Sequence, residues 1–272
     1  MNSLSPQQLL QDLLVEFEAS PPLDEAMICI AVDEDQEADR DAILRELDRI
    51  ASGIHLPYPD SPFDVISRIN THLFDTLGFQ GDYDDYHNPQ NSLIHKVLES
   101  KKGLPIMLSA LYIEIARRLD FEVLGIGFPY HFIVQPAHCE PVPFFIDPFY
   151  RGKILLEDDL RALLQSYNLR IPLQEAVAPT STRQIIQRMS NNLFFSYQKR
   201  KDNDGVLRNL ERLILISPEC PDLFKIRSSL FASMGKIQQA IFSLKTYLEC
   251  CQDSDDRSEC EQRLKMLMKL SR

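Results

Sequence analysis

Apolar residues recur at helical spacing through the first third of the chain. The stretch "SPQQLLQDLLVEFEAS" begins with Ser5 and Pro6, which are typical of a helix N-cap and a first helical turn. One face of this predicted helix carries the apolar residues Leu9, Leu10, Leu13, Leu14 and Phe17. A second helical pattern covers residues 24–50, with a break predicted near the acidic residues 33–41, and a third begins at Phe63 after a Pro-rich connector. These segments predict a packed helical layer.

The middle of the chain changes from helical spacing to short runs typical of strands. Asn91 is predicted to cap a helix that Gly103 closes, and the next helix begins at Pro105, where proline is tolerated because the first-turn N–H has no helical partner. Runs rich in Phe, Val and Ile then predict antiparallel strands over residues 121–128, 131–136 and 142–149. After the strands the pattern predicts a helix and then a Pro-rich linker, at residues 155–167 and 171–184.

Beyond the linker the sequence repeats with a period of 34 residues. The apolar positions that match at this distance are Tyr197 and Phe231, Val206 and Ala240, Leu210 and Leu244, and Leu213 and Tyr247. This period, with Gly235 at a turn between helices, resembles the tetratricopeptide repeat. Two repeat units with "CEQRLKMLMKL" as a capping helix are predicted, and a generic helical bundle is the alternative. The predicted fold class is α+β: a mostly helical domain with a small antiparallel sheet over residues 1–178, then an all-α helical-repeat domain over residues 179–272.

The net charge of −11 is unevenly distributed along the chain. Residues 179–272 carry a net charge of +5, and residues 1–178 carry −16. This balance argues against nucleic acid as a partner, because phosphate binding requires clustered Lys and Arg. Two surfaces with different partners would explain the division, and so would ordinary solvated faces.

The sequence contains no pattern typical of a membrane span or a secretory signal. No apolar run approaches the roughly 20 residues that cross a bilayer, and "MNSLSPQQLL" lacks the basic-then-apolar pattern of a signal peptide. The six cysteines show neither CxxC pairs nor a histidine at zinc-ligand spacing. We therefore expect a cytoplasmic protein with reduced thiols, no cofactor and no metal.

The helix after Gly103 and the two strands that follow it have the order of a cysteine-type active site. In such a site a helix N-terminus activates the thiol, a histidine on the next strand is the base, and an aspartate on the following strand orients the histidine. His131 and Asp147 occupy the last two places, although Pro105 starts the helix and no cysteine lies near it in sequence. The alternative for the pair is structural, with a buried His131 donating to a nearby carboxylate.

These residues belong to a longer pattern. "FQGDYDDYHNPQNSLIHKVLESKKGLPIMLSALYIEIARRL", then "GIGFPYHFIV" and "FIDPFYRGKIL", resembles the SirB-type family, in which a transglutaminase-like domain precedes tetratricopeptide repeats. The resemblance covers roughly residues 24–260 and is most specific over residues 79–154. It implies that the catalytic cysteine of transglutaminase-like proteins, two residues after the glycine, corresponds to Pro105. It also implies that Tyr130 replaces the glycine that usually precedes the histidine.

A polar and aromatic cluster lies near this helix, and a groove that it shares with His131 and Asp147 is the expected binding pocket. The predicted pocket residues are Tyr86, His87, Asn91, Ser109 and Tyr130, with His95 nearby in sequence. The resemblance places the Asn-Ser pair of "NPQNSL" in the family's motif, whereas helix capping and pinning of the preceding loop is the structural alternative. Spacing gives no support to a metal site built from His87, His95, His131 and Asp147.

Two functions from different classes follow. The first is an adaptor in which a catalytically silent transglutaminase-like domain recognises a protein or peptide, and the helical repeats bind a further, acidic partner through Lys199, Arg200, Arg208 and Arg212. The resemblance implies a bacterial regulator, from a family linked to regulation and to protein turnover that has no agreed reaction. Pro105 at the position of the cysteine predicts a pseudoenzyme. The second is a hydrolase or acyl transferase on amide bonds, in which His131 and Asp147 act with water, Ser109 or a partner's group in place of the usual thiol. Cys139 lies in the loop between the two predicted strands and would have to approach this site from outside. A homodimer through the open ends of the repeats is a further expectation.

Overall fold

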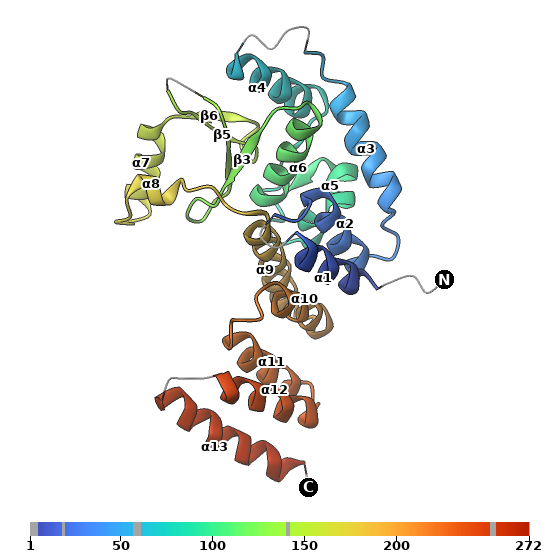
Figure 1. The fold of residues 1–272 in the computed structure, drawn as a ribbon, viewed down its shortest axis with the longest axis vertical. Helices are drawn as coiled ribbons and strands as arrows, with labels where there is room; N and C mark the ends of the chain where they lie inside the picture. The colour runs from blue at the N-terminus through green and yellow to red at the C-terminus, as the bar shows by residue number, and fades with distance from the viewer. Residues whose placement is uncertain (1–4, 18–19, 57–60, 140–141, 251–253, 272) are drawn as a thin grey trace. The chain divides into compact units, whose positions relative to one another are not determined.

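The structure is a computed structural model that describes residues 5–17, 20–56, 61–139, 142–250 and 254–271. The chain divides into two compact units, Met1–Met189 and Ser190–Arg272. The first is mostly helical with small sheets, and the second is helical throughout its described residues (Figure 1). This confirms the predicted fold class. The boundary after residue 178 stays a prediction.

Helices make up most of the first unit. In its described residues the α-helices are α1 (Pro6–Glu16), α2 (Leu23–Glu34), α3 (Arg40–Ser52), α4 (Pro62–Asn70), α5 (Ile94–Ser100), α6 (Pro105–Arg118), α7 (Glu157–Ser166) and α8 (Leu173–Ala176). A π-helical turn, η1 (Thr71–Thr76), extends α4, and a 3-10 turn, η2 (Pro89–Ser92), precedes α5. The predicted break in the second helical segment is confirmed between α2 and α3.

The predicted start of the first helix is confirmed. The Ser5 hydroxyl accepts a hydrogen bond from the Gln8 N–H at 3.2 Å, and proline occupies the first turn. The apolar face is narrower than the sequence predicts. Leu10 and Leu14 are buried in α1, whereas Leu9 is exposed.

The prediction that Asn91 caps a helix is wrong. Asn88 caps the 3-10 turn by accepting from the Gln90 N–H at 3.1 Å, and α5 begins after a leucine without a side-chain cap. Asn91 is buried, and its amide donates to Asp82 Oδ2 at 3.0 Å and to the Asp85 carbonyl at 2.8 Å. The side chain therefore fastens the loop before the turn, which was the second part of the structural alternative.

The main sheet is an antiparallel meander in the order β3-β4-β5-β6. Its strands are β3 (Val123–Ile126), β4 (Ile133–Pro136), β5 (Phe145–Asp147) and β6 (Lys153–Leu155). The first three confirm the strands predicted from the Phe-, Val- and Ile-rich runs. Strand β6 was not predicted, because "RGKIL" is too short to show a period-2 pattern. A second, parallel pair joins β1 (Gln80–Gly81) to β2 (Lys102–Gly103) just before α6.

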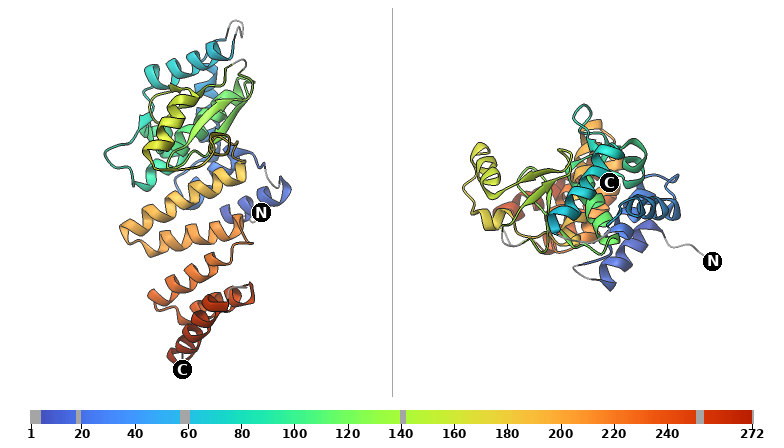
Figure 2. Two further views of the ribbon diagram at one scale, coloured as in Figure 1. Left: turned by 90° about the vertical axis from the view of Figure 1, so that its left-hand side faces the viewer. Right: turned by 90° about the horizontal axis from the view of Figure 1, so that it is seen from above.

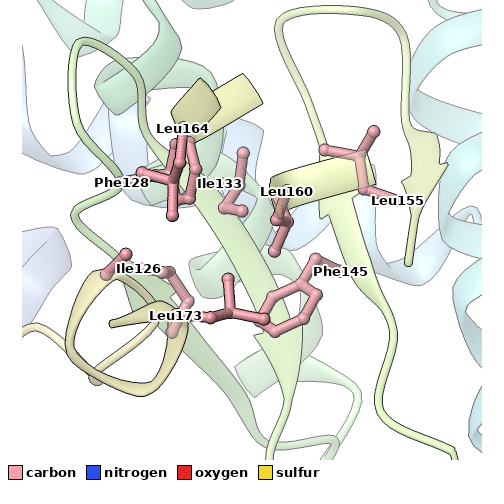
Figure 3. Packing of buried hydrophobic residues seen from close by; sticks show 9 residues of the cluster. Ile126, Phe128, Ile133, Phe145, Leu155, Leu160, Leu164 and Leu173 are labelled. Carbon is pink, nitrogen blue, oxygen red and sulfur yellow. The ribbon is translucent and has the colours of Figure 1, made fainter. Parts of the chain in front are cut away.

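Helices lie on both sides of the main sheet, with α6 against β3 and β4, and α7 and α8 on the other side (Figure 2). Figure 3 shows the packing beneath α7 and α8, where Ile126, Ile133 and Phe145 of the strands meet Leu160 and Leu173. Burial of these apolar side chains stabilises the sheet, at roughly 1.5–3 kcal/mol for each fully buried Leu, Ile or Phe. The β4 and β5 ends next to this core carry the candidate site.

The predicted linker at residues 171–184 is partly ordered against the sheet. It contains α8, and Pro179 forms an isolated antiparallel bridge with Ile126 of β3. The Thr180 N–H donates to the Gly125 carbonyl at 2.8 Å, and the Thr180 hydroxyl accepts from the Gly127 N–H at 2.8 Å. These bonds cover the open edge of β3, where unpaired backbone groups would otherwise face solvent.

A network of ion pairs joins α2, α3 and α6. Glu114 of α6 is 1% exposed, and its Oε2 accepts from Arg117 at 2.7 Å and from Arg118 at 2.6 Å. Asp24 of α2 accepts from the same two arginines, at 2.8 and 3.0 Å. The exposed Asp48 of α3 lies 2.8 Å from Arg118. A buried charge is costly unless it is partnered, so this network fixes the three helices against one another.

The second unit stacks helical hairpins. Helix α9 (Thr182–Arg200) begins in the first unit, and α10 (Asn203–Ile216), α11 (Asp222–Ser233), α12 (Ile237–Cys250) and α13 (Ser254–Leu270) follow it. Gly235 turns between α11 and α12 with a φ of 72°, a conformation that favours glycine. The buried Ser228 hydroxyl donates to the Ala240 carbonyl at 2.8 Å. Cys260 and Leu267 of α13 pack on α12, as predicted for a capping helix. Every helix within the described residues is either too short or too polar to span a bilayer.

Candidate functional site

His131 and Asp147 meet at one end of the β4–β5 pair. His131 lies two residues before β4, Asp147 ends β5, and the antiparallel register brings these ends together. His131 Nε2 is 2.6 Å from Asp147 Oδ2. A carboxylate only accepts hydrogen bonds, so Nε2 carries the proton and Nδ1 is left to face another group. Asp147 Oδ1 accepts from the backbone N–H groups of Phe149 and Tyr150, at 3.1 and 3.2 Å. The carboxylate therefore fixes the orientation of the imidazole.

The pair lines a cavity of about 330 Å³. Pro105, the first residue of α6, lines the same cavity, so a helix N-terminus, a histidine and an aspartate share one site. The other lining side chains are mostly aromatic or aliphatic: Tyr86, Tyr130, Phe149, Tyr150, Lys153, Leu155, Leu163 and Tyr167. These three groups come together in the order that the sequence predicts for a cysteine-type active site, and Pro105 stands at the helix N-terminus.

The described residues that line this cavity include no cysteine or serine. Cys139 accepts a weak hydrogen bond from Gln135 Nε2 at 3.7 Å, near the other end of β4. Four strand positions separate Gln135 from His131, which corresponds to roughly 13 Å. Ser109 is fully buried and donates to the Phe132 carbonyl at 3.2 Å. Neither Cys139 nor Ser109 reaches a group held in the cavity.

Tyr130 stands in a backbone conformation that favours glycine. Its φ is 58°, in the left-handed region, and its side chain is 75% exposed. A left-handed L-residue costs roughly 1–2 kcal/mol, and little of this tyrosine is buried to offset that cost. Its ring meets the Tyr167 ring edge-on, with centroids 5.3 Å apart. Strain of this kind is often retained at functional sites.

Replacing Tyr130 with glycine is expected to leave the protein as stable as the wild type or more stable, by up to about 1 kcal/mol. The gain comes from relief of the left-handed backbone and is reduced by the loss of the contact with Tyr167. Urea unfolding measures the change. Tyr130→Ala is the matched control because it loses the same ring and keeps the strain, so it should be about 1 kcal/mol less stable than Tyr130→Gly. Equal stabilities for the two variants would show that the backbone at this position is unstrained.

Arg188 on α9 contacts the backbone of the candidate site at His131. This contact was not predicted from the sequence. The Arg188 guanidinium donates to the His131 carbonyl at 2.5 Å and lies over the Phe132 ring, 5.3 Å from the centroid. Burial lowers the pKa of Arg188 from its ordinary value, although an arginine stays charged at neutral pH. Because 57 residues separate it from His131, no local signal reveals the contact. The lining aromatics Phe149 and Tyr150, by contrast, directly follow Asp147-Pro148 in sequence.

The structure brings only part of the predicted pocket together. Tyr86 and Tyr130 line the cavity, and burial raises the pKa of Tyr86, which keeps its phenol protonated. His87 lies edge-on to Tyr86 with ring centroids 5.3 Å apart. Asn91 holds the upstream loop, as described above. His95 instead forms a hydrogen bond with Asp35, the residue after α2, at 2.9 Å, and with Lys96 it holds the pKa of Asp35 well below its usual range. Among the described residues no group of three or more His, Cys, Asp or Glu side chains is arranged to hold a metal ion.

The four basic residues predicted for the repeat groove do not share one environment. Lys199 and Arg200 are exposed near the end of α9, and Arg208 lies over the Tyr197 ring at 5.6 Å. Arg212 is 1% exposed and donates to Asn209 Oδ1 at 2.6 Å, so it stabilises the interior of the unit. A hollow of about 390 Å³ lies on α10, α11 and α12, lined by Glu211, Arg227, Phe231, Gln238, Gln239, Phe242 and Ser243.

Comparison with protein families agrees with this geometry. The profile of the transglutaminase-like superfamily matches residues 41–191, and a tetratricopeptide repeat profile matches residues 193–265. The chain therefore belongs to the transglutaminase-like superfamily, with tetratricopeptide repeats following the transglutaminase-like domain.

Among individual proteins, a UPF0162 protein of Xylella fastidiosa is 31% identical over 189 residues, which cover 68% of this chain and 67% of that protein. A UPF0162 protein of Pseudomonas aeruginosa is 26% identical over 264 residues, 96% of each chain. F-box only protein 21 of Mus musculus is 30% identical over 191 residues, which cover 66% of this chain and 30% of that protein. No solved structure gives a significant match.

Proposed function

We propose that the chain is a protein–protein adaptor, in which a catalytically silent transglutaminase-like domain is joined to tetratricopeptide repeats that bind a partner protein. The observation that carries the proposal is Pro105, which lines the cavity beside His131 and Asp147 and has no nucleophilic atom. No cysteine or serine among the described lining residues replaces it. Stacked helical repeats are typical surfaces for peptides and helices, which supports the role of the second unit.

Further parts of the proposal concern the family, the place of action and the partner. The motifs over residues 79–154 support assignment to the SirB-type family and a regulatory role in the bacterial cytoplasm. The exposed Lys199 and Arg200 support an acidic partner. The match to a region that makes up 30% of F-box only protein 21 supports a domain that works as a module within larger proteins.

The ordered His131–Asp147 pair favours a second candidate, a hydrolase or acyl transferase on amide bonds. In that case His131 would remove a proton from water through Nδ1, because Asp147 holds Nε2. The positive end of α6 at Pro105 would stabilise an oxyanion. The two candidates differ in one observable, which is whether a bound partner changes in mass.

The adaptor is tested by capture from lysate with the full chain as bait, followed by intact-mass measurement of each retained protein. His131→Ala should leave the retained partner and its mass unchanged. Phe242→Ala should reduce retention roughly tenfold, because an aromatic side chain that is 67% exposed beside a hollow is a typical binding hot spot. Met266→Ala, which removes an exposed side chain of α13 outside the hollow, is the matched control and should retain the partner normally.

Two results would contradict parts of the proposal, the first its catalytic silence and the second its partner surface. A partner whose mass is altered by the wild-type bait and not by His131→Ala would show that the cavity is catalytic. Retention that survives Phe242→Ala and is lost with Met266→Ala would move the partner surface away from the hollow. Circular dichroism of each bait establishes that the variants are folded.

A further inference from the structure

Exposed tyrosines gather around the cavity of the candidate site. The sequence has nine tyrosines, and those exposed among the described residues are Tyr83, Tyr86, Tyr130, Tyr150 and Tyr167. Tyr83 does not line the cavity, yet its ring centroid lies 5.8 Å from that of Tyr150, which does. Tyrosine offers a large contact area and a hydroxyl while losing little rotamer entropy, so it is enriched at binding surfaces. An exposed aromatic cluster of this kind indicates an interaction site.

The rings hold one another in place. Tyr130, in the turn between β3 and β4, meets Tyr167 at the end of α7 with an interplanar angle of 77°. Phe149 makes edge contacts with Tyr83, Tyr86 and Tyr150, at centroid distances of 4.8, 6.1 and 5.4 Å. A surface that is ordered before binding loses less entropy when a ligand arrives. The aromatic cluster is therefore preorganised.

The charges at the cavity favour a neutral ligand. Asp147 is 3% exposed and accepts three hydrogen bonds, from His131 Nε2 and from the N–H groups of Phe149 and Tyr150, so little of its carboxylate is open to a cation. Lys153 lines the cavity and adds a positive charge that repels cationic ligands. A polyanion is opposed by the net charge of −16 over residues 1–178. The cavity would therefore recognise a ligand through apolar contacts and hydrogen bonds.

We propose that this tyrosine-lined cavity binds an extended, proline-containing segment of a partner protein. The inference rests on the proposed function, because it needs a cavity that holds a partner without altering it. Prolines in a polyproline II helix dock between aromatic rings in grooves of this composition, and their free carbonyls accept hydrogen bonds from tyrosine hydroxyls. A volume of about 330 Å³ is small for a whole ligand and suits one or two anchoring side chains. The rest of the segment would lie across the exposed rings.

Tyr130 supports a binding role for the cavity, because its side chain contributes little to the stability of the fold. The backbone at this position favours glycine, and the fold gains almost no burial from the side chain. Its ring contributes to the wall of the cavity together with Tyr167. A strained, exposed tyrosine therefore serves the surface rather than the core, and its removal separates binding from folding.

The test is selection of a display library of random peptides, about ten residues long, on the immobilised full chain, with Tyr130→Gly as the counter-selected bait. Proline should be enriched severalfold among peptides that prefer the wild type. The best peptide, labelled with fluorescein, is then titrated by fluorescence anisotropy. Its affinity should fall roughly tenfold or more for Tyr130→Gly and for a version of the peptide with each proline changed to alanine. Phe63→Ala, which removes an exposed aromatic of α4 that does not line the cavity, should bind like the wild type.

The possible results separate this inference from the adaptor function. Peptides enriched in Lys or Arg, or peptides that bind the wild type and Tyr130→Gly equally, overturn the proline-segment inference and leave the adaptor intact. Peptides that are recovered cleaved or attached to the bait overturn catalytic silence as well. Tyr130→Gly is expected to be at least as stable as the wild type, and its urea unfolding curve distinguishes a loss of binding from unfolding.

Discussion

Changing Pro105 to cysteine is expected to produce a thiol of unusually high reactivity. The introduced side chain would stand at the N-terminus of α6, in the cavity that His131 lines. The helix dipole and a histidine that accepts the proton both stabilise a thiolate, so the thiol pKa should fall below the ordinary value of about 8.5. At pH 6 the introduced thiol should react with iodoacetamide roughly tenfold or more faster than an ordinary cysteine.

The molecule provides an internal control for this experiment. Cys139 is a partly exposed free thiol at the far end of the same strand pair, and peptide mass mapping distinguishes it from position 105. Adding His131→Ala to Pro105→Cys should return the introduced thiol to an ordinary pH profile. If Pro105→Cys and Cys139 react at similar rates throughout the pH range, the cavity does not retain the layout of a cysteine site.

Replacing Glu114 with alanine should lower the free energy of unfolding by about 3 kcal/mol. The substitution removes the buried carboxylate that receives Arg117 and Arg118, and Arg118 has only 11% of its side chain exposed. Asp24 still contacts both arginines, so the loss should lie at the lower end of the range for broken buried ion pairs. Urea unfolding followed by circular dichroism measures the loss, and hydrogen exchange should localise it to α2, α3 and α6.

Asp48→Ala is the matched control for Glu114→Ala. Asp48 contacts the same Arg118, at 2.8 Å, but 68% of its side chain is exposed. Exposed ion pairs contribute little, so this variant should lose less than about 1 kcal/mol. If the two substitutions cost the same, the burial of Glu114 is not what makes the network stabilising.

Local sequence signals predicted the elements of the fold well where one residue type decides the geometry. Ser5 before Pro6 located the first helix, and Gly235 located the turn between the repeat helices. Asn91 misled because an asparagine before a helix suits a cap and a buried loop anchor equally well. Its partners Asp82 and Asp85 are known only after the loop is folded.

The part of the candidate site that depends on strand pairing could be predicted from the sequence. The part that depends on contacts between distant segments could not. Antiparallel strands explain why His131 and Asp147 lie side by side. Arg188, however, reaches the His131 carbonyl from the first turns of α9, 57 residues further along the chain, and nothing near either residue in sequence signals the contact. Ser109 shares the helix of Pro105, yet its face packs on the backbone at Phe132. Helical spacing predicts which residues share one face of a helix, but it does not predict which part of the protein packs against that face.

Pro179 and Thr180, which pair with the open edge of β3, limit where the chain can be truncated or fused to another domain. A polypeptide that ends before Pro179 loses the bridge to Ile126 and the bonds of Thr180, and it also lacks Arg188. The bared strand would then be a template for joining other chains edge to edge, which favours aggregation. Gene fusions, truncations and natural domain shuffling that preserve solubility must therefore carry the first turns of α9 along with the sheet. The profile of the transglutaminase-like superfamily extends to residue 191 and so includes Pro179, Thr180 and Arg188.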